Sequence, residues 1–543
     1  MTYTPEGYIY LCKCPLENDY KNQLTFTSRD KQKEYFDSIV YTSYSDYTYI
    51  KKDSMIKVNA PIDAIIDCNY LFYKNASFNE FYYYCFITRM EYINTNVTAI
   101  YFETDSFQTY WDYITYNPCF IEREHVNDDR IGANIVPEGL ETGDYIIQKN
   151  TEGTANLKFN MHSKMNIVIA VSTTYLDIAI PSNIRFYNGI YSGLIFLTFR
   201  DFTNATRYIN YIQPKASQDV IYSVFMAPRP LCEQGSDFQY YSIQDGNTSF
   251  NVGFILNSNY SGLIASQTVT KPTDIDSYIP KNNKLFVFPY RYFTITNNCG
   301  SSANYVYEYF YGSKCKFNIL GALGVGCSIK LIPTNYNTGV TNPDTNVFEA
   351  NLMYGLDAGK LPISNWTNNS FQNYMKQNAV NFALDIVQDT MMIGTGLGVG
   401  ALTGGIGGAS MAGTGLSNVL DNLKTIYNHS LTPVTVKGGV TNGDLIYSME
   451  EGFTLYKRCI KRENAMIIDD FFSMFGYKIN RVKVPNITGR ENWNYVKTIN
   501  CNFDGINIPQ TDMETIRKMF DNGVTFWHNP STMYNYNNSN NIV

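Results

Sequence analysis

The chain has 543 residues, a formal net charge of −7, and a composition of 44% hydrophobic, 17% charged and 15% aromatic residues. This length allows about three or four domains with ordinary cores, and the negative charge argues against a general nucleic-acid binder, which would normally be basic. The 46 tyrosines and 33 phenylalanines favour half-buried strands and wet interfaces. We therefore predict a mainly β, multidomain protein with some helices, built into an assembly.

The 11 cysteines show no short repeating framework. Cys12 and Cys14 are separated by one residue and the sequence contains no CxxC pair, so neither a zinc site nor a disulfide scaffold is indicated. We expect reduced, buried thiols. The N-terminus lacks the basic and apolar regions of a secretory signal, and we expect synthesis in a cytoplasm.

Residues 1–125 are predicted to be an N-terminal, β-rich domain. The run EFYYYCFITRMEYI at 80–93 is strand-like, NTN at 94–96 provides a turn, and apolar positions alternate again from residue 97. This pattern predicts a β-hairpin.

The middle of the chain, residues 126–345, is also predicted to be β-rich. Its clearest strands are MNIVIAVSTTYLDIAI at 165–180 and KLFVFPYRYFTI at 284–295, whereas QDGNTSF at 244–250 is typical of a loop. The pattern predicts no single architecture for this region.

Helical spacing replaces the β pattern near Phe371. Apolar residues from Phe371 to Val387 predict an amphipathic helix, so that 346–384 forms a linker and a lead-in helix. A glycine-rich loop follows at 385–440, and apolar residues from Leu416 to Ile426 predict a second helix at its far side.

Between Asp389 and Asp421 the chain carries no charge for 31 residues, of which ten are glycine. Glycine recurs every four residues from 396 to 408, which in a helix gives a stripe without side chains that allows close packing in lipid. A full helix would extend about 46 Å, longer than a ~30 Å hydrocarbon core. Ten glycines, however, weaken such a helix by roughly 1 kcal/mol each. Two alternatives stay open on these grounds: a small-residue packing loop and a conditional membrane-active segment.

The membrane-active segment would use its large apolar side chains and the glycines between them. These candidate residues are Met391, Met392, Ile393, Gly394, Gly396, Leu397, Gly398, Val399, Gly400, Leu402, Gly404, Gly405, Ile406, Gly408, Met411 and Leu416.

The C-terminal segment, 441–543, is predicted to be α+β. Gly476 fits the position after a helix at 466–475 (MIIDDFFSMF), before a strand. The apolar face of this helix is predicted to contain Ile467, Ile468, Phe471, Phe472 and Phe475. Thr511 and Glu514 form a capping-box pattern for a second helix. That helix should end at 521–523, and VTFWH should enter a strand.

No catalytic set stands out among the four histidines. EREH at 122–125 could ligate a metal, but strand alternation places Glu122 and Glu124 on one face and His125 on the other, which favours a solvated strand. GLGVGA at 396–401 matches a dinucleotide fingerprint but follows a predicted helix instead of a strand. We therefore expect no enzyme activity, cofactor or metal site.

Basic residues cluster between Lys457 and Lys497. A solvated face explains such a cluster, and contact with a phosphate backbone or a neighbouring protein is the alternative.

Several stretches closely resemble the tail knob proteins of small short-tailed phages of Gram-positive bacteria, the Picovirinae type. The strings that carry this resemblance, in chain order, are ENDYKN followed by FTS, FETDSFQTY, FIEREHV, KLFVFPY, FFSMFGYKINRVKVPN, NYVKT and FDNGVTFWH.

The resemblance implies a β-rich subunit of a hexameric tube at the distal tail end, in which the N- and C-terminal segments build the tube and double-stranded DNA passes through the lumen. It also implies a long apolar loop, here 385–440, that plugs the tube and emerges to perforate the host membrane. The implied partners are five further copies, the lower collar and tail proteins of the virion, and host membrane lipid.

Two other classes of function are weighed against this one. A receptor-binding tail protein would also be β- and Tyr-rich but would not need the charge-free tract. A cell-wall hydrolase would need a paired acid and base or a metal set, and none can be read from the sequence.

Overall fold

The computed structural model describes most of the chain outside one long internal stretch. The described residues are 7–45, 47–50, 54–74, 82–148, 156–159, 165–181, 184, 186–187, 190–191, 193–215, 220–255, 262–321, 323, 328–337, 354–360, 363–365, 452–505 and 508–543. Both helices predicted around the glycine-rich loop lie outside these ranges.

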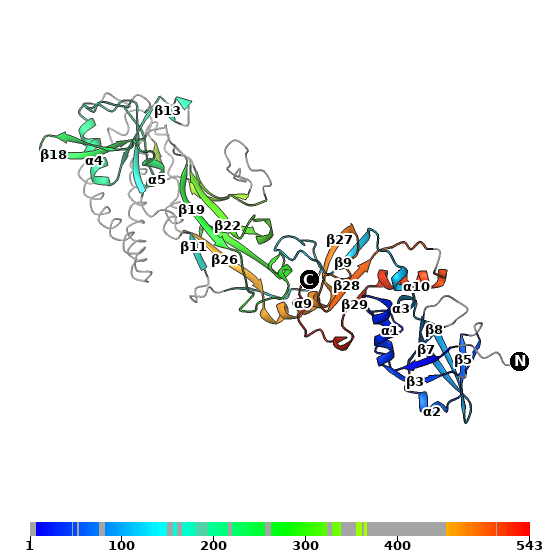
Figure 1. The fold of residues 1–543 in the computed structure, drawn as a ribbon. Coiled ribbons are helices and arrows are strands. Elements are labelled where there is room, and N and C mark those ends of the chain that lie inside the picture. Colours follow the sequence, from blue (N-terminus) through cyan, green and yellow to red (C-terminus); the bar gives the residue numbers. More distant parts are fainter. Residues whose placement is uncertain are drawn as a thin grey trace. The chain divides into compact units, whose positions relative to one another are not determined.

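The chain divides into two compact units, each made of separate stretches (Figure 1). The terminal unit contains Met1–Asp144, Asp274–Tyr290 and Ile460–Val543, and the inserted unit contains Tyr145–Thr273 and Arg291–Cys459. The segment boundaries predicted at 125, 345, 384 and 440 stay predictions.

The terminal unit begins with a seven-stranded antiparallel sheet, the N-terminal sheet, in the order β3-β1-β6-β7-β8-β5-β4. Its strands are β1 (Ile9–Cys12), β3 (Val40–Tyr44), β4 (Tyr47–Ile50), β5 (Met55–Val58), β6 (Tyr70–Lys74), β7 (Tyr82–Asn94) and β8 (Val97–Thr104). The predicted hairpin is confirmed: β7 pairs with β8, and the Asn94 side chain accepts a 2.9 Å hydrogen bond from the Asn96 amide.

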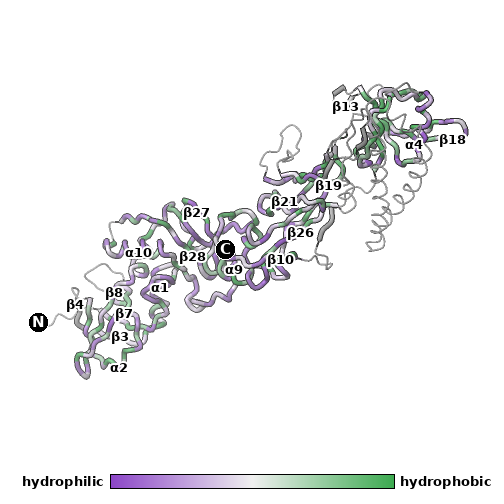
Figure 2. The backbone as a smooth tube through the Cα atoms, turned by 180° about the vertical axis from the view of Figure 1, so that it is seen from behind, coloured by the Kyte–Doolittle hydropathy of each residue, from purple (hydrophilic) through white to green (hydrophobic). Residues whose placement is uncertain are grey.

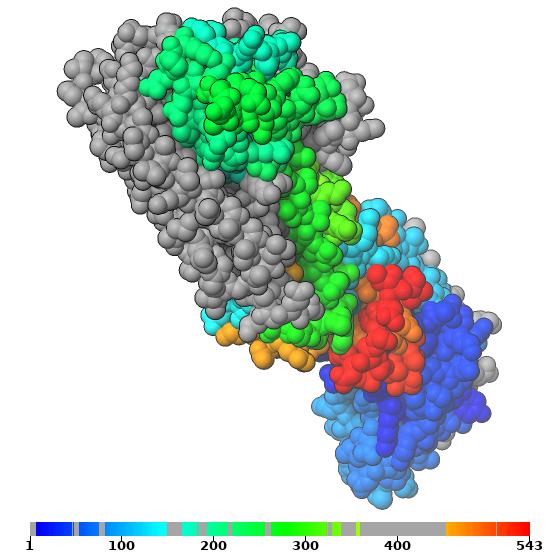
Figure 3. Space-filling view, turned by 90° about the vertical axis from the view of Figure 1, so that its left-hand side faces the viewer, coloured from blue at the N-terminus to red at the C-terminus, as the bar shows by residue number. Residues whose placement is uncertain are grey.

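A second sheet, the junction sheet, joins the two ends of the chain in the order β2-β29-β28-β9-β27. Its strands are β2 (Asn22–Leu24), β9 (Cys119–Glu124), β27 (Tyr477–Lys483), β28 (Trp493–Thr498) and β29 (Val524–Trp527). Strand β2 runs parallel to β29, so Gln23 lies opposite Phe526. In Figure 3 the red C-terminal surface of this unit accordingly lies against blue N-terminal surface.

Five helices of the terminal unit pack on these sheets: α1 (Arg29–Ser38), α2 (Ile62–Ile65), α3 (Ser106–Tyr110), α9 (Arg462–Phe475) and α10 (Gln510–Asn522). Ser28 caps helix α1, because its hydroxyl accepts from the Lys31 amide at 3.2 Å. Its Phe36 is fully buried in an aromatic cluster that also contains Trp493 and Trp527. This cluster joins the N-terminal sheet to the junction sheet.

The helix predicted before Gly476 is confirmed as α9, although it begins four residues earlier than Met466. Gly476 has a φ of 64°, and a Cβ there would lie 2.2 Å from the Glu124 carbonyl oxygen, so this position requires glycine. The predicted apolar face is only partly right, because Ile468 is buried whereas Ile467 is exposed.

The second C-terminal helix is confirmed as α10, and VTFW forms β29 as predicted. The predicted capping box is wrong. Pro509 occupies the capping position without a side-chain bond, and Thr511 already lies in the first turn. The Pro509 carbonyl, which accepts from the Asp512 and Met513 amides at 3.0 Å, begins this helix, and no side-chain hydroxyl caps it.

The described residues of the inserted unit form three main sheets and a two-stranded ribbon, with the strand orders β17-β18-β15-β12-β16-β25, β19-β22-β23-β24, β10-β26-β20-β21 with β11 beside β26, and β13-β14. The strands are β10 (Tyr145–Ile147), β11 (Asn156–Phe159), β12 (Met165–Val171), β13 (Phe186–Tyr187), β14 (Ile190–Tyr191), β15 (Ile195–Phe199), β16 (Ile221–Pro228), β17 (Tyr240–Asp245), β18 (Thr248–Phe254), β19 (Leu263–Thr270), β20 (Arg291–Thr296), β21 (Ser302–Tyr305), β22 (Lys314–Gly321), β23 (Ser328–Pro333), β24 (Leu356–Lys360), β25 (Ile363–Asn365) and β26 (Phe453–Ile460).

Helix α4 (Phe202–Ile212) covers the six-stranded sheet of this unit, and the short α5 (Arg229–Cys232) follows β16. Asp201 caps α4 by accepting from the Asn204 amide at 2.8 Å. Tyr208 and Ile212 pack with Phe250 in one core, and Figure 2 shows α4 beside β18.

Three local predictions for the middle region need correction. The strand at 165–180 ends at Val171. The strand at 284–295 begins only at Arg291, since 283–286 is a 3-10 turn and Pro289 has no amide for a ladder. QDGNTSF is not a loop but the tip of the β17–β18 hairpin, where Gly246 has a φ of 60°.

A buried ion cluster fixes the connection between the junction sheet and the 274–290 stretch. The Glu138 side chain is fully buried and forms ion pairs with both Arg123 and Lys284, and it also accepts a 2.8 Å hydrogen bond from the Lys478 amide. Because these charges have left water, their mutual pairing is what makes their burial tolerable.

We predict that Glu138→Gln lowers the free energy of unfolding by about 3–5 kcal/mol, because it leaves Lys284 charged and buried. Asp144→Asn is the matched control: it breaks the exposed Lys461–Asp144 pair and should cost less than about 1 kcal/mol. Urea unfolding followed by tryptophan fluorescence measures both. Equal losses in the two variants would contradict the cluster's role.

Candidate functional site

All sixteen residues of the predicted membrane-active segment, from Met391 to Leu416, lie outside the described residues. The structure does define the strands on either side of the stretch that holds them. Strand β25 pairs with β16, and β26 pairs with both β20 and β11. Phe453, Leu455 and Cys459 of β26 are fully buried. The chain therefore leaves from one sheet of the inserted unit and returns into another.

Within the described ranges, no helix combines the length and the apolar character needed to cross a membrane.

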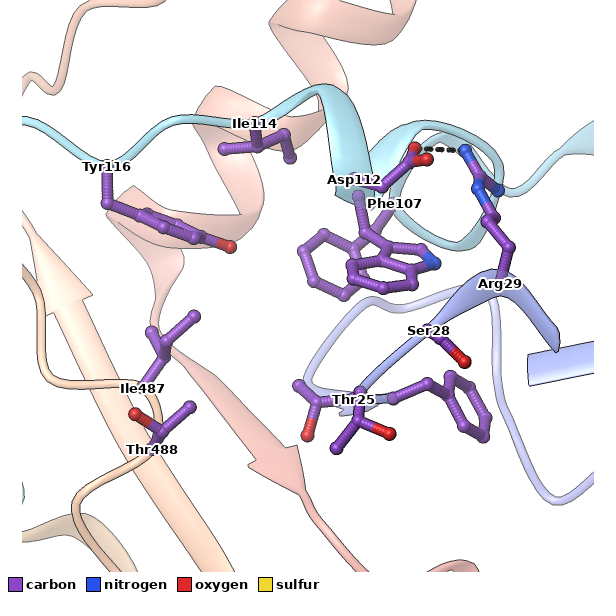
Figure 4. Close-up of a pocket in the computed structure, with 12 residues that line it drawn as sticks. Thr25, Ser28, Arg29, Phe107, Asp112, Ile114, Tyr116, Ile487 and Thr488 are labelled. Carbon is purple, nitrogen blue, oxygen red and sulfur yellow. Dashed lines mark hydrogen bonds and ion pairs between the residues drawn. The ribbon is translucent and has the colours of Figure 1, made fainter. Parts of the chain in front are cut away.

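The terminal unit contains a hollow of about 500 Å³ between three stretches of chain (Figure 4). Its lining is mainly apolar and aromatic, and Phe107 and Tyr116 are directed into it opposite Ile487. Tyr116 is largely buried, packs edge-on against Phe520 with the ring centres 6.1 Å apart, and has a raised pKa because of this burial.

The one guanidinium at the rim of this hollow is neutralised. Arg29 forms an ion pair with Asp112 and donates a 2.8 Å hydrogen bond to the Thr109 carbonyl, and it lies 5.7 Å from the Trp111 ring centre. The hollow can therefore accept an apolar group, and the one ion pair in its lining, Arg29 with Asp112, carries no net charge.

One hydrogen-bonded chain near this hollow has the order of a catalytic triad. The Thr25 hydroxyl lies 2.8 Å from His528 Nδ1, and His528 Nε2 lies 2.9 Å from the Asn494 side-chain oxygen. Thr25 also contacts the Trp527 carbonyl at 3.2 Å, and burial lowers the pKa of His528 to about 4, which makes it a weak base. We interpret this hydrogen-bonded set of Thr25, His528 and Asn494 as a clamp that joins the end of β2 to the end of β29.

A second hollow of about 450 Å³ lies beneath the C-terminal residues 537–542. Arg490 donates to the Asn540 and Val126 carbonyls at 3.2 and 2.7 Å, and Asp129 accepts from Tyr477 and from the Asn283 amide. Burial lowers the pKa of Arg490 and raises that of Asp129. Arg490 thus holds the chain's own C-terminal segment through Asn540, while Asp129 fixes Tyr477 and the 274–290 stretch.

The EREH motif is not a solvated strand, and this prediction is wrong. Register shifts in both neighbours of β9 disturb the alternation. Glu124 is buried and pairs with Lys483, whereas Glu122 reaches Lys497 at 2.8 Å. His125 is buried, with Nδ1 accepting from the Tyr495 amide at 2.7 Å and Nε2 at 3.1 Å from the Ser473 carbonyl.

Metal and thiol chemistry find little support in the part of the chain that the structure describes. It contains no group of three or more His, Cys, Asp or Glu that could hold a metal ion. None of its ten cysteines forms a disulfide, and eight are buried. Burial raises the pKa of Cys14 to about 12, so its reactive thiolate is not populated.

Ion pairs neutralise part of the basic cluster at 457–497. Lys461, Lys483 and Lys497 each pair with a carboxylate, while Arg481 is exposed at the edge of the junction sheet. This arrangement does not form a continuous track for a phosphate backbone.

Family models identify the chain. Residues 250–541 match the C-terminal domain of tail knob protein gp9 of Bacillus phage phi29, and residues 8–115 match the N-terminus of the caudoviral major tail protein. The chain belongs to the tail knob family.

Individual relatives agree with this assignment along nearly the whole chain. It is 26% identical to tail knob protein gp9 of Bacillus phage B103, over 96% of this chain and 97% of that one, and 27% identical to gp9 of phage phi29, over 95% and 96%. The fold resembles the tail knob protein gp12 of bacteriophage C1, with a TM-score of 0.62 at 15% identity, covering 99% of this chain and 100% of that one. The predicted family and the mainly β, multidomain fold are confirmed.

The chain is thus a tail knob protein, a structural component of a phage virion tail, and tail assembly implies other tail proteins as partners. The sequence predicted this family from several short stretches at both ends of the chain, which resemble those of the family and occur in the same order. The internal clamp of Thr25, His528 and Asn494 was missed, because Thr25 is 503 residues from His528 and no local pattern joins them.

We predict that His125 makes the terminal unit less stable as the pH falls. Burial, and then the nearby Arg490 guanidinium, lowers the pKa of His125 to about 3. Between about pH 6.5 and 4 the unfolded chain therefore binds a proton that the native state excludes, and stability falls by roughly 1.4 kcal/mol per pH unit.

The test is urea unfolding of the wild type and of His125→Gln at several pH values. The variant should lose this slope relative to the wild type. The comparison also removes the opposite contribution of Asp105, whose burial raises its pKa to about 7. Parallel pH profiles would show that His125 does not titrate in this way.

Proposed function

We propose that six copies of the chain form a tube at the distal tip of the virion tail, through which double-stranded DNA passes without sequence recognition. The loops at 385–440 plug the lumen before infection and afterwards enter the host cell membrane, which opens the way for the genome. The lower collar and tail proteins hold the tube from above. The role is structural and requires no catalysis or cofactor.

The observation that carries this proposal is an uncharged stretch of 31 residues, between Asp389 and Asp421, in a member of the tail knob family. The flanking strands β25 and β26 support it, because both are paired within sheets of the inserted unit and provide fixed points of departure and return. A stretch with two firm ends can change its own conformation without unfolding its support.

Composition gives the driving force and the adaptability. Side chains such as Leu397, Val399, Leu402 and Ile406 gain roughly 25 cal/mol per Å² when their apolar surface leaves water. In the plugged lumen the copies shelter one another, and in the bilayer lipid shelters them. The ten glycines disfavour any single rigid helix, which suits a segment that must occupy two environments.

The net charge of −7 per subunit is consistent with a conduit for DNA. An anionic protein repels the phosphate backbone, so the nucleic acid is not retained on its way through the tube.

We predict that a peptide of residues 385–425 releases dye from liposomes at micromolar concentration. The control peptide carries Val399→Lys and Leu402→Lys, two charges that each cost roughly 2.5–3.5 kcal/mol in the centre of a bilayer. It should bind weakly and release little dye. Intact vesicles with the natural peptide would count strongly against membrane activity and in favour of a receptor-binding tail protein without it.

A further inference from the structure

The strands before and after the long internal stretch meet at one tight turn of the inserted unit. Strand β24 comes before this stretch and pairs with β23, whereas β26 comes after it and pairs with β20. The two strands belong to different sheets. Residues 297–301, which connect β20 to β21, bind both of them, and we call this connection the anchor turn.

Asn297 binds the strand that precedes the stretch. Its side-chain amide donates to the Asp357 carbonyl of β24 at 2.8 Å. Its side-chain oxygen accepts from the Cys299 and Ser301 amides at 2.9 and 3.0 Å, which closes the turn. The Asn297 side chain is 5% exposed. One primary amide thus uses its acceptor to shape the turn and its donor to hold β24.

Asn298, the next residue, binds the strand that follows the stretch. Its side-chain amide donates to the Gly452 carbonyl at 2.7 Å and to the Thr454 hydroxyl at 3.0 Å. Asn298 has a φ of 59°, a left-handed conformation that asparagine adopts more readily than most residues. Its backbone amide donates to the Thr296 hydroxyl at 3.1 Å. Since Gly452 and Thr454 are buried, the start of β26 is held in a site shielded from water.

The hairpin that carries the anchor turn is itself firmly supported. Tyr305 of β21 is 1% exposed and donates a 2.7 Å hydrogen bond to the Tyr354 carbonyl, two residues before β24. On β20, Ile295 is fully buried and Thr296 lies opposite Thr454 of β26. The anchor turn is therefore fixed to the core of its own sheet.

We propose that the anchor turn holds both ends of the membrane-active segment, with Asn297 and Asn298 as positioning residues for β24 and β26. The inference rests on the proposed function for the role of the segment, and it names the residues that fix the segment's ends. Because both ends are held at one turn, the segment can move from the lumen to the bilayer without separating β24 or β26 from its sheet. Each asparagine donates to a backbone carbonyl, so both contacts depend on its side-chain amide.

Aspartate variants of the full chain test the two contacts separately. Asn297→Asp keeps the oxygen that closes the turn but replaces the donor to Asp357 with a second oxygen. Asn298→Asp removes the donor to Gly452 in the same way, and aspartate also tolerates a positive φ. Asn480→Asp is the matched control, because Asn480 is exposed, has a φ of 47° and lies in the terminal unit. Thermal unfolding verifies that each variant folds.

Hydrogen–deuterium exchange followed by mass spectrometry measures how often each strand end opens. In Asn297→Asp, residues 354–360 should exchange roughly tenfold faster than in the wild type, because one buried hydrogen bond is lost and its acceptor is left unpaired. Residues 452–456 should keep their rate in this variant. Asn298→Asp should show the reverse pattern, and the control should match the wild type in both regions.

This crossed pattern distinguishes an anchor with two separate contacts from general support of the fold. Equal acceleration of both regions in each variant, or no acceleration in either, overturns the anchor turn. Neither result depends on membrane activity, which dye release by the peptide of residues 385–425 tests by itself. Intact vesicles in that assay, together with the crossed exchange pattern, would contradict the proposed function and leave both contacts in place.

Discussion

The parallel pairing of β2 with β29 is the constraint on which the rest of the fold depends. It places residues 22–24 beside 525–527, and the indole of Trp527 donates to the Asn22 side chain at 3.0 Å. Behind this pair, Trp493 and Trp527 pack into the same core as Phe36. The entropic cost of closing so long a chain segment stays moderate, because this cost rises only with the logarithm of the segment's length, by about 0.6 kcal/mol for each doubling. Both termini thus contribute to one unit, with the junction sheet as their shared element.

This closure makes the middle of the chain an insertion. The inserted unit leaves the terminal unit after Asp144 and returns to it at Ile460, with one further exchange at 274–290. The buried Glu138, Arg123 and Lys284 cluster and the Asp469 carboxylate, which accepts from Tyr278 and Asn282, fix that 274–290 stretch in place. A segment that must change environment is best carried by such an insertion, because its movement leaves the closed terminal unit undisturbed. The proposed tube and the proposed loop therefore occupy separate parts of the chain.

Local patterns predicted those elements whose cause is local. The turn at Asn94–Asn96, the stop of α9 at Gly476 and the strand β29 follow from turn chemistry, a positive φ and apolar β-formers, and the structure confirms them. The errors have distant causes. Glu124 is buried because Lys483, 359 residues away, neutralises it and because the ladder around β9 is irregular. The Asp245-Gly246 pair is typical of a hairpin turn, but the polar composition of QDGNTSF led to the prediction of a loop. The glycine tract was recognised by its composition, and its role stays a prediction because it lies outside the described residues.

Electron cryomicroscopy of the purified, assembled protein tests the central claim most directly, because it locates the tract from Gly394 to Gly408 relative to the symmetry axis. The account predicts a six-fold ring in which the terminal units form the wall and the six tracts gather at the shared axis. A tract packed permanently inside the core of its own subunit, away from any common lumen, would contradict it.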